Sequence, residues 1–198
     1  PFAGMTIRSP VKKEKRDRRE PFTPGEKQQI LAAFDDRHPH YGPYVRFLFL
    51  TGCRTSEANG LQWGDIGDDA ITFQRARMEN RQQQGLKTQA RRQFPVNNQL
   101  RDLLDSLDRG KPTDFVFSME SGSPVDGHNF LNRIWRPTVK DLPIPYRPQY
   151  ATRHTFITEC LTAGVPVATI AAWVGNTPQT IYQSYAGSIP MPVPDIEI

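Results

Sequence analysis

Arg54 and Glu57 are the first residues whose types and spacing could act on a charged substrate. They lie in the segment 51–57, where an apolar stretch ends at Gly52 and the arginine follows almost at once. Residues three positions apart share one face of a helix, so the two side chains can meet. A guanidinium held at such a junction can bind a phosphate through two parallel hydrogen bonds. Taken alone, the pair is more typical of a surface ion pair.

Tyr150 and Arg153 form a second pair with the same spacing, in the segment 150–157. On a helix, the phenol and the guanidinium would face the same space, while Phe156 and Ile157 would supply a stripe that packs on the core. An ordinary amphipathic helix shows the same pattern, so this segment alone does not establish a site.

Tyr185 is the candidate nucleophile among the tyrosines. It stands near the end of a short helical segment that is followed by Ala186, Gly187 and a proline-rich tail. That position is poorly suited to the core, so we expect an accessible phenol. Tyr182 is the competitor, but its neighbour Ile181 indicates a buried face, and we interpret Tyr182 as structural.

The elements that must position these residues are mainly helical. Thr23, Pro24 and Glu26 give the start of the first helix, because threonine caps, proline fits the first turn and the acid suits the positive helix end. Alternation around Ile71 and Phe94 predicts two or three antiparallel strands with a polar turn. A short strand or an extended segment is expected at 114–118. Further helices are expected at 44–52, 54–60, 100–107, 129–139, 149–163, 166–174 and 178–185. The predicted fold class is mainly α with a small antiparallel β-sheet (α+β).

Composition limits the class of protein. The 198 residues are 37% hydrophobic and 23% charged, with a net charge of +4, which is enough for one domain with a full core. No run of about 18 apolar residues and no signal peptide is present, so we expect a cytoplasmic protein. Cys53 and Cys160 are interpreted as reduced thiols of the core. Neither the cysteines and histidines nor the acidic residues are spaced for a metal, so no cofactor is expected.

Positive charge is concentrated in residues 8–19. A solvated tail is the ordinary interpretation of such a run, and a segment that lies along DNA phosphates is the alternative. The candidate DNA-binding residues in it are Lys12, Lys13, Lys15, Arg16, Arg18 and Arg19.

Together, these segments resemble the catalytic domain of the tyrosine recombinase, or phage integrase, family. The resemblance rests on an ordered set of motifs across residues 21–187. They are Pro-Phe-Thr (21–23), T-G-x-R-x-S-E (51–57), Lys-Thr (87–88), x-x-R-H-T-F (151–156), A-G-V…I-x-x-W-x-G (163–175) and T-x-x-x-x-Y-A (180–186). The resemblance implies site-specific recombination through a covalent 3′-phosphotyrosyl intermediate, by a mostly helical domain with a small three-stranded sheet.

The resemblance also implies a role for each matching position. Arg54 and Arg153 are similar to the two arginines that clamp the scissile phosphate, and Glu57 to the acid that orients the first of them. Lys87 resembles the lysine that protonates the leaving oxygen, and Tyr185 the nucleophile. The chemistry fits these residue types, since guanidiniums can stabilise the charge that builds up at phosphorus without a metal ion.

Three positions qualify this assignment. The family usually has a histidine where this chain has Tyr150, and a histidine or tryptophan where it has Asn176. Both replacements can donate a hydrogen bond to a phosphate oxygen, but neither is a good proton acceptor near neutral pH. His154 could compensate. Because it neighbours Arg153, it should point about 100° away, and we expect it instead to pack between helices and bond to the backbone.

Three other functions compete with recombination. Residues 161–185 could form a helix-turn-helix of a DNA-binding regulator, although that leaves Arg54, Glu57 and Lys87 unexplained. The replacements at Tyr150 and Asn176 are compatible with a decayed recombinase that binds DNA without cutting it. A type IB topoisomerase-like enzyme would nick and reseal by similar chemistry.

The resemblance implies an organisation and a set of partners. Residues 1–20 are expected to be a basic interdomain linker, 21–187 the catalytic domain, and 188–198 a tail that tethers neighbouring protomers or is disordered. The chain would be a fragment of a longer integrase from a bacterial host, a phage or a mobile element. The expected partners are double-stranded DNA, further copies in a tetramer on two DNA sites, and accessory DNA-bending proteins.

Overall fold

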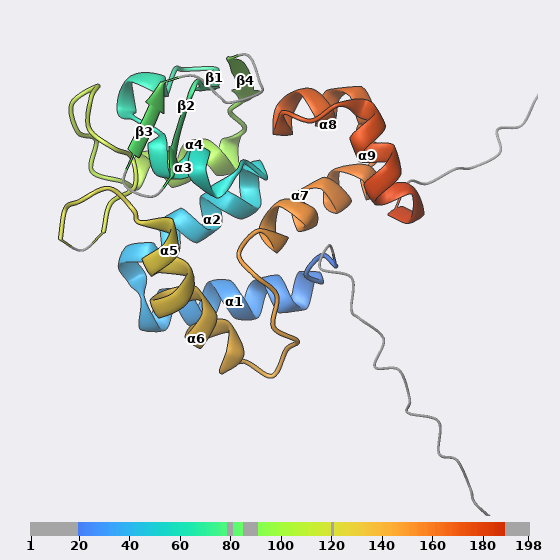
Figure 1. Cartoon of the computed structure of the whole chain (residues 1–198), viewed down its shortest axis with the longest axis horizontal. Helices are drawn as coiled ribbons and strands as arrows, with labels where there is room; N and C mark the ends of the chain where they lie inside the picture. Colours follow the sequence, from blue (N-terminus) through green and yellow to red (C-terminus); the bar gives the residue numbers. More distant parts are fainter. Residues whose placement is uncertain (1–19, 79–80, 85–90, 120, 189–198) are drawn as a thin grey trace, which may run out of the picture.

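A computed structural model describes residues 20–78, 81–84, 91–119 and 121–188 of the chain. Helices dominate this part of the molecule (Figure 1). They are α1 (Pro24–Arg37), α2 (Gly42–Thr51), α3 (Thr55–Gly60), α4 (Asn98–Asp105), α5 (Gly127–Asn129), α6 (Arg136–Lys140), α7 (Ala151–Thr162), α8 (Val167–Val174) and α9 (Pro178–Tyr185), with 3-10 turns η1 (Pro39–Tyr41), η2 (Trp63–Asp65) and η4 (Ala186–Ser188). The expected helix at 129–139 is divided, because the π-helical turn η3 (Phe130–Trp135) separates α5 from α6.

Local signals set several helix ends. Thr23 caps α1 in a capping box with Glu26, as the sequence predicted. Gly52 and Gly175 end α2 and α8 in the left-handed conformation, with φ of 56° and 68°, which glycine adopts without strain. Since Arg54 stands two residues after Gly52 and Asn176 directly after Gly175, the two helix ends set where these side chains begin.

The strands form two antiparallel pairs. β1 (Ala70–Phe73) pairs with β4 (Arg92–Pro95), and Ile71 lies opposite Phe94; β2 (Arg75–Met78) pairs with β3 (Arg81–Gln84). The predicted fold class is therefore confirmed. Of the two alternatives for 114–118, the extended segment holds and the strand does not. Phe115 and Ser118 make single bridges, and the partner of Ser118 is Pro124, which lacks the N–H that a longer ladder requires.

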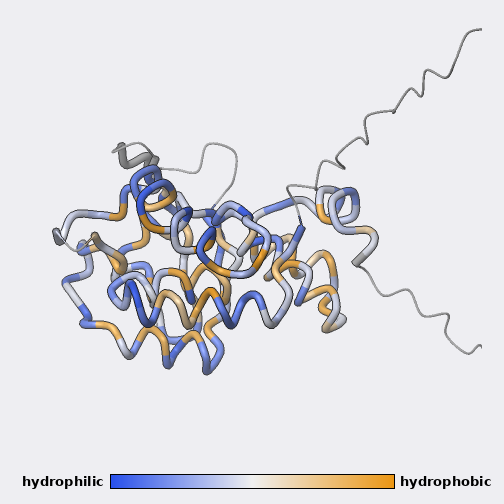
Figure 2. The backbone as a smooth tube through the Cα atoms, turned by 90° about the horizontal axis from the view of Figure 1, so that it is seen from below, coloured by the Kyte–Doolittle hydropathy of each residue, from blue (hydrophilic) through white to orange (hydrophobic). Residues whose placement is uncertain are grey.

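Helix α2 lies at the centre of the core. Val45, Phe47 and Leu48 on it are fully buried, and it packs against α1, α4 and α7. Helices α8 and α9 lie beyond α7 at one side of the molecule (Figure 1), where α8 also contacts β4. Apolar positions recur along the helices and do not form continuous stretches (Figure 2). Within the described ranges, no helix has the length and apolar character needed to cross a membrane.

We predict that Gly52→Ala lowers the free energy of unfolding by roughly 2–4 kcal/mol. A Cβ at Gly52 would lie 2.5 Å from Cδ1 of the Phe156 side chain, so overpacking adds to the cost of the left-handed backbone. Gly164 is the matched control, since it also has a positive φ of 77° but has open space around it. Gly164→Ala should cost only about 1 kcal/mol. Urea unfolding measures the free energy of unfolding of both variants. Equal decreases would show that the contact with Phe156 does not contribute to the cost.

Candidate active site

Arg54 lies in the turn between α2 and α3 and bridges two parts of the chain. Its backbone N–H donates to Oε2 of Glu57 at 2.8 Å, and its Nη1 donates to Oε1 at 3.1 Å. Its Nη2 donates to the carbonyl of Gly175 at 2.8 Å and lies 3.5 Å from Oδ1 of Asn176. The Arg54 side chain is 31% exposed. The guanidinium is thus held in place yet remains partly accessible to an anion.

Glu57 is fully buried and has a second arginine as partner. Nη1 and Nη2 of Arg92 donate to its two carboxylate oxygens at 2.7 and 2.6 Å. The Nε of Arg92 donates to the carbonyl of Trp173 at 2.9 Å, and the guanidinium lies 4.5 Å from the centre of the Phe73 ring. The result is a buried Arg54–Glu57–Arg92 triad that joins α3, β4 and the end of α8.

The sequence analysis missed Arg92, although one signal pointed to it. Arg92 and Phe94 are two positions apart on β4, so they share one face of the strand. Phe94 is buried, which places Arg92 on the inward face. An arginine there requires a partner, and Glu57 is that partner.

Two arginines keep Glu57 ionised. Burial raises the pKa of its carboxyl, but the hydrogen bonds and charge of Arg92, together with the N–H and charge of Arg54, bring the pKa below its ordinary value. The triad therefore contains a carboxylate at neutral pH.

Arg153 lies in the first turn of α7 and is almost fully buried. Its Nη1 donates to the carbonyl of Gly52 at 2.8 Å, two residues before Arg54. Its Nη2 is buried and has no hydrogen-bond partner among the described residues. Burial lowers the pKa of this guanidinium, and the positive charge of Arg54 lowers it further, while the carboxylate of Glu57 raises it. Arginine nevertheless stays charged, so Arg153 holds a charged donor that is available to an anion.

The structure gives His154 a side-chain partner that the sequence did not predict. Its Nδ1 makes a hydrogen bond with the hydroxyl of Tyr185, which α9 brings to that side of α7. Tyr150 stands one turn earlier, 43% exposed, with its ring edge-on to His154 at 5.3 Å between centroids.

The expected environments of the two tyrosines were reversed. Tyr185 is 8% exposed, whereas Tyr182 is 54% exposed. Positions four apart share a helix face, so the buried Ile181 predicts a buried Tyr185 and not a buried Tyr182. Tyr182 points outward from α9, and Tyr185 is held against α7.

The described structure thus brings together Arg54, Glu57 and Asn176, with Arg153 joined to them through Gly52. At the start of α7, Tyr150 and His154 lie close to Arg153 in the sequence, and their rings contact each other. Tyr185, at the end of α9, contacts His154. Lys87 lies outside the described residues, and so does the basic run that contains Lys12, Lys13, Lys15, Arg16, Arg18 and Arg19. Among the residues that are described, no group of three or more His, Cys, Asp or Glu could hold a metal ion.

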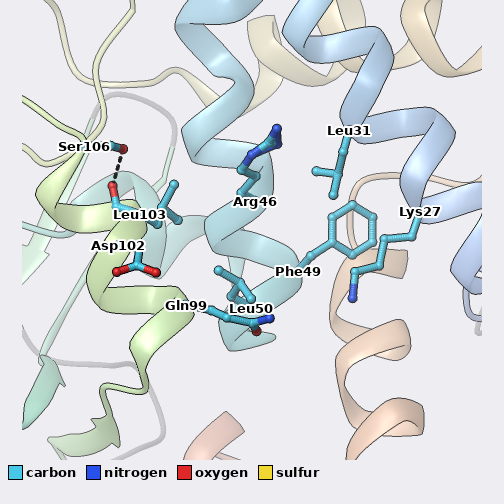
Figure 3. Close-up of a pocket in the computed structure, with 9 residues that line it drawn as sticks. All are labelled: Lys27, Leu31, Arg46, Phe49, Leu50, Gln99, Asp102, Leu103 and Ser106. Atoms are coloured by element: carbon cyan, nitrogen blue, oxygen red, sulfur yellow. Dashed lines mark hydrogen bonds between the residues drawn. The ribbon is translucent and has the colours of Figure 1, made fainter.

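A hollow of about 500 Å³ lies between α1, α2 and α4 (Figure 3). Its walls come from Leu31, Phe49, Leu50 and Leu103, with Lys27, Arg46 and Asp102 among the polar groups. None of the candidate site residues lines it. It is therefore separate from the cluster around Arg54 and Arg153.

Comparison with known proteins gives one family. A family model described as "Phage integrase family" matches residues 20–189. A curated protein, "Tyrosine recombinase XerC-like" from Caldanaerobacter subterraneus subsp. tengcongensis, is 25% identical over 79% of this chain and 50% of its own length. The chain therefore spans about half the length of this relative.

Solved structures share the fold. The Tn1549 transposon integrase, in complex with transposon right-end DNA, matches with a TM-score of 0.74 and 18% identity, over 87% of this chain and 63% of that one. The catalytic domain of bacteriophage HP1 integrase matches with a TM-score of 0.59 and 22% identity, over 86% and 88%. The XerA recombinase matches with a TM-score of 0.62 and 19% identity, over 84% and 57%.

We predict that Glu57→Gln destabilises the fold by about 3 kcal/mol at neutral pH, since the largely buried Arg92 and the partly buried Arg54 lose their carboxylate. A carboxyl group whose pKa is lowered by folding stabilises the protein above its unfolded pKa, and this contribution is lost as pH falls through the folded pKa. The difference between wild type and variant should therefore be full at pH 7 and shrink below the ordinary value of 4.5.

Urea unfolding at several pH values measures this difference. Glu159→Gln is the control, because Glu159 pairs with Lys27 at 41% exposure and should contribute less than about 1 kcal/mol. A difference for Glu57→Gln that does not change with pH would contradict the assignment of the stabilisation to the ionised carboxylate.

Proposed function

Because this chain belongs to the phage integrase family, we propose that it carries the catalytic chemistry of site-specific DNA recombination. In this proposal, Tyr185 attacks a DNA phosphodiester and forms a 3′-phosphotyrosyl link, which a 5′ hydroxyl of another strand then reseals. The observation that carries the proposal is the contact of the Tyr185 hydroxyl with Nδ1 of His154. The preceding residue is Arg153, whose buried Nη2 has no hydrogen-bond partner among the described residues. The proposed nucleophile on α9 thus contacts the proposed proton acceptor on α7, and the neighbouring residue Arg153 has a hydrogen-bond donor available for the phosphate.

Arg54 and Arg153 are proposed to bind the two non-bridging oxygens of the scissile phosphate. Nη2 of Arg153 would donate to one oxygen, and the exposed part of Arg54 to the other. Attack at phosphorus adds negative charge to these oxygens, and fixed guanidiniums stabilise that charge without rearranging. Asn176, beside Arg54, and the exposed Tyr150 are proposed as further hydrogen-bond donors. The positive charge that the reaction needs would thus come from side chains, without a metal ion.

His154 is proposed to accept the proton of Tyr185. Tyrosine has a pKa of about 10, so little of it is ionised near neutral pH without such an acceptor. For Nδ1 to accept, the ring must carry its own proton on Nε2. This role goes beyond that of a supporting residue, and it supplies the acceptor that Tyr150 and Asn176 cannot be.

The proton and bond changes balance across the step. The phenol of Tyr185 gives its proton to His154, the bond from its oxygen to phosphorus forms, and the bond from phosphorus to the 5′ oxygen breaks. Lys87 is proposed to protonate that 5′ oxygen. In resealing, an incoming 5′ hydroxyl gives its proton to Lys87 as its oxygen bonds to phosphorus, the bond from phosphorus to the Tyr185 oxygen breaks, and His154 returns its proton to the phenol.

The remaining partners are part of the same proposal. The chain would bind double-stranded DNA, as the named Tn1549 integrase complex does, with residues 8–19 along the phosphates. It would act in tetramers on two DNA sites, with residues 188–198 as the tether between protomers and with accessory DNA-bending proteins. We expect the cytoplasm as the site of action.

We predict that Tyr185→Phe abolishes covalent attachment to DNA. On a suicide substrate that traps the cleaved strand, wild type should form a protein–DNA adduct that survives denaturation. Tyr182→Phe is the control, because it removes an exposed hydroxyl three residues away on the same helix. An adduct that persists in Tyr185→Phe and vanishes in Tyr182→Phe would reassign the nucleophile. Absence of any adduct with wild type would favour a protein that binds DNA without cutting it.

We predict that His154→Asn slows adduct formation by about 100-fold or more, the usual size of general-base assistance. Asparagine can occupy the hydrogen-bonding position of Nδ1 but cannot take up a proton. His40→Asn is the control, because His40 is exposed and its Nε2 bonds to the carbonyl of Ser118, away from the candidate site. Single-turnover rates at saturating protein separate this effect from DNA affinity. A His154→Asn rate within threefold of wild type would exclude His154 as the acceptor.

A further inference from the structure

Building on the proposed function, we infer that Arg92 is a positioning residue for the cleavage step. It fixes Glu57 and the end of α8 at once, and these two groups hold the guanidinium of Arg54. Arg92 would not touch the DNA. It would act on the reaction only through Arg54.

The contacts of Arg92 lead to Arg54 by two separate routes. The first runs through Glu57, whose Oε1 accepts from Nη1 of Arg92 at 2.7 Å and from Nη1 of Arg54 at 3.1 Å. The second runs through α8, where Nε of Arg92 donates to the carbonyl of Trp173. Gly175, two residues later, accepts from Nη2 of Arg54 at 2.8 Å. Nη1 and Nη2 of Arg54 therefore each meet a group that Arg92 restrains.

The second route depends on the end of α8. The last carbonyls of a helix have no partner inside the helix, and Gly175 turns the chain away with a φ of 68°. Arg92 satisfies one of these carbonyls from a neighbouring strand. Without it, the turn that carries Gly175 and Asn176 would lose its anchor on β4.

Only arginine can make all of these contacts together. Its planar guanidinium presents a fork to both carboxylate oxygens while Nε points elsewhere, whereas the ammonium of lysine is a single point. The Arg92 side chain is 9% exposed and rests on the ring of Phe73, so its orientation is fixed. Arg92 is thus held rigidly by several contacts at once, unlike the arginine of a surface ion pair.

A second possible route to the reaction must be separated from this one. Arg92 opens β4 and lies five positions after Lys87 in the sequence. Replacing it could therefore disturb the proposed acid of the leaving group and not the phosphate clamp. The two routes predict different rates of adduct formation for an Arg92 variant on a substrate whose leaving group needs no acid.

The experiment compares Arg92→Met and Arg92→Lys with the neighbour Arg91→Met, which removes an exposed guanidinium. Single-turnover adduct formation is measured at saturating protein, below the unfolding temperature of every variant. We expect a loss of about 100-fold for Arg92→Met, the size of a 1 Å misplacement, a smaller loss for Arg92→Lys, and no loss for Arg91→Met. DNA affinity should change less than threefold.

Two further measurements identify the route. With a 5′-bridging phosphorothiolate, the leaving sulfur needs no proton, so the loss in Arg92→Met should persist. If this substrate restores the rate, Arg92 acts through Lys87 and the inference is wrong. In the background of Arg54→Lys, Arg92→Met should cost far less than it does alone, because residues that act as a unit are not additive. Full additivity would reduce Arg92 to a structural residue.

The outcome also separates this inference from the proposed function. If wild type forms the adduct and Arg92→Met matches its rate within threefold, the inference about Arg92 is wrong and the proposed function stands. If wild type forms no adduct on either substrate, the proposed function itself fails.

Discussion

The burial of the Glu57 carboxylate between two guanidiniums is the interaction on which the candidate site depends. An isolated buried carboxylate would be very costly, and it is tolerated here because Arg54 and Arg92 occupy both of its oxygens. This requirement fixes the neighbouring backbone. α3 must begin where the N–H of Arg54 also reaches Glu57, β4 must present Arg92 inward, and α8 must end where the Trp173 carbonyl meets Arg92.

Helix α7 provides the second constraint, because its first turn points side chains in fixed directions. Arg153 turns toward the end of α2 and bonds to Gly52. The next residue, His154, turns toward α9 and meets Tyr185. A helix separates neighbouring side chains by about 100°, so one turn can present a phosphate donor to one side and a proton acceptor to the other. The contact brings the end of α9 against α7, where Tyr185 is buried.

How far the sequence predicts this site depends on whether a feature is local. The cap at Thr23 and the helix ends at Gly52 and Gly175 follow from the conformational preferences of their own residues. The partners of Arg92 and His154 lie on other elements, at positions that only tertiary packing decides. The misassignment of Tyr182 and Tyr185 has a different origin. The periodicity with Ile181 contained the correct answer, but adjacency in sequence was given more weight than the shared helix face.

The charges of the site explain why it should favour a phosphodiester and, more strongly, its transition state. Arg54, Arg92 and Arg153 with the ionised Glu57 carry a net charge of +2. Burial disfavours the charged form of Arg153, as its lowered pKa shows, so its uncompensated charge is unfavourable in the free protein. A phosphate supplies one negative charge where Nη2 of Arg153 has no partner in the described structure, and attack by Tyr185 increases the negative charge there. Because the triad and α7 already hold the guanidiniums in place, little of this gain is lost to rearrangement.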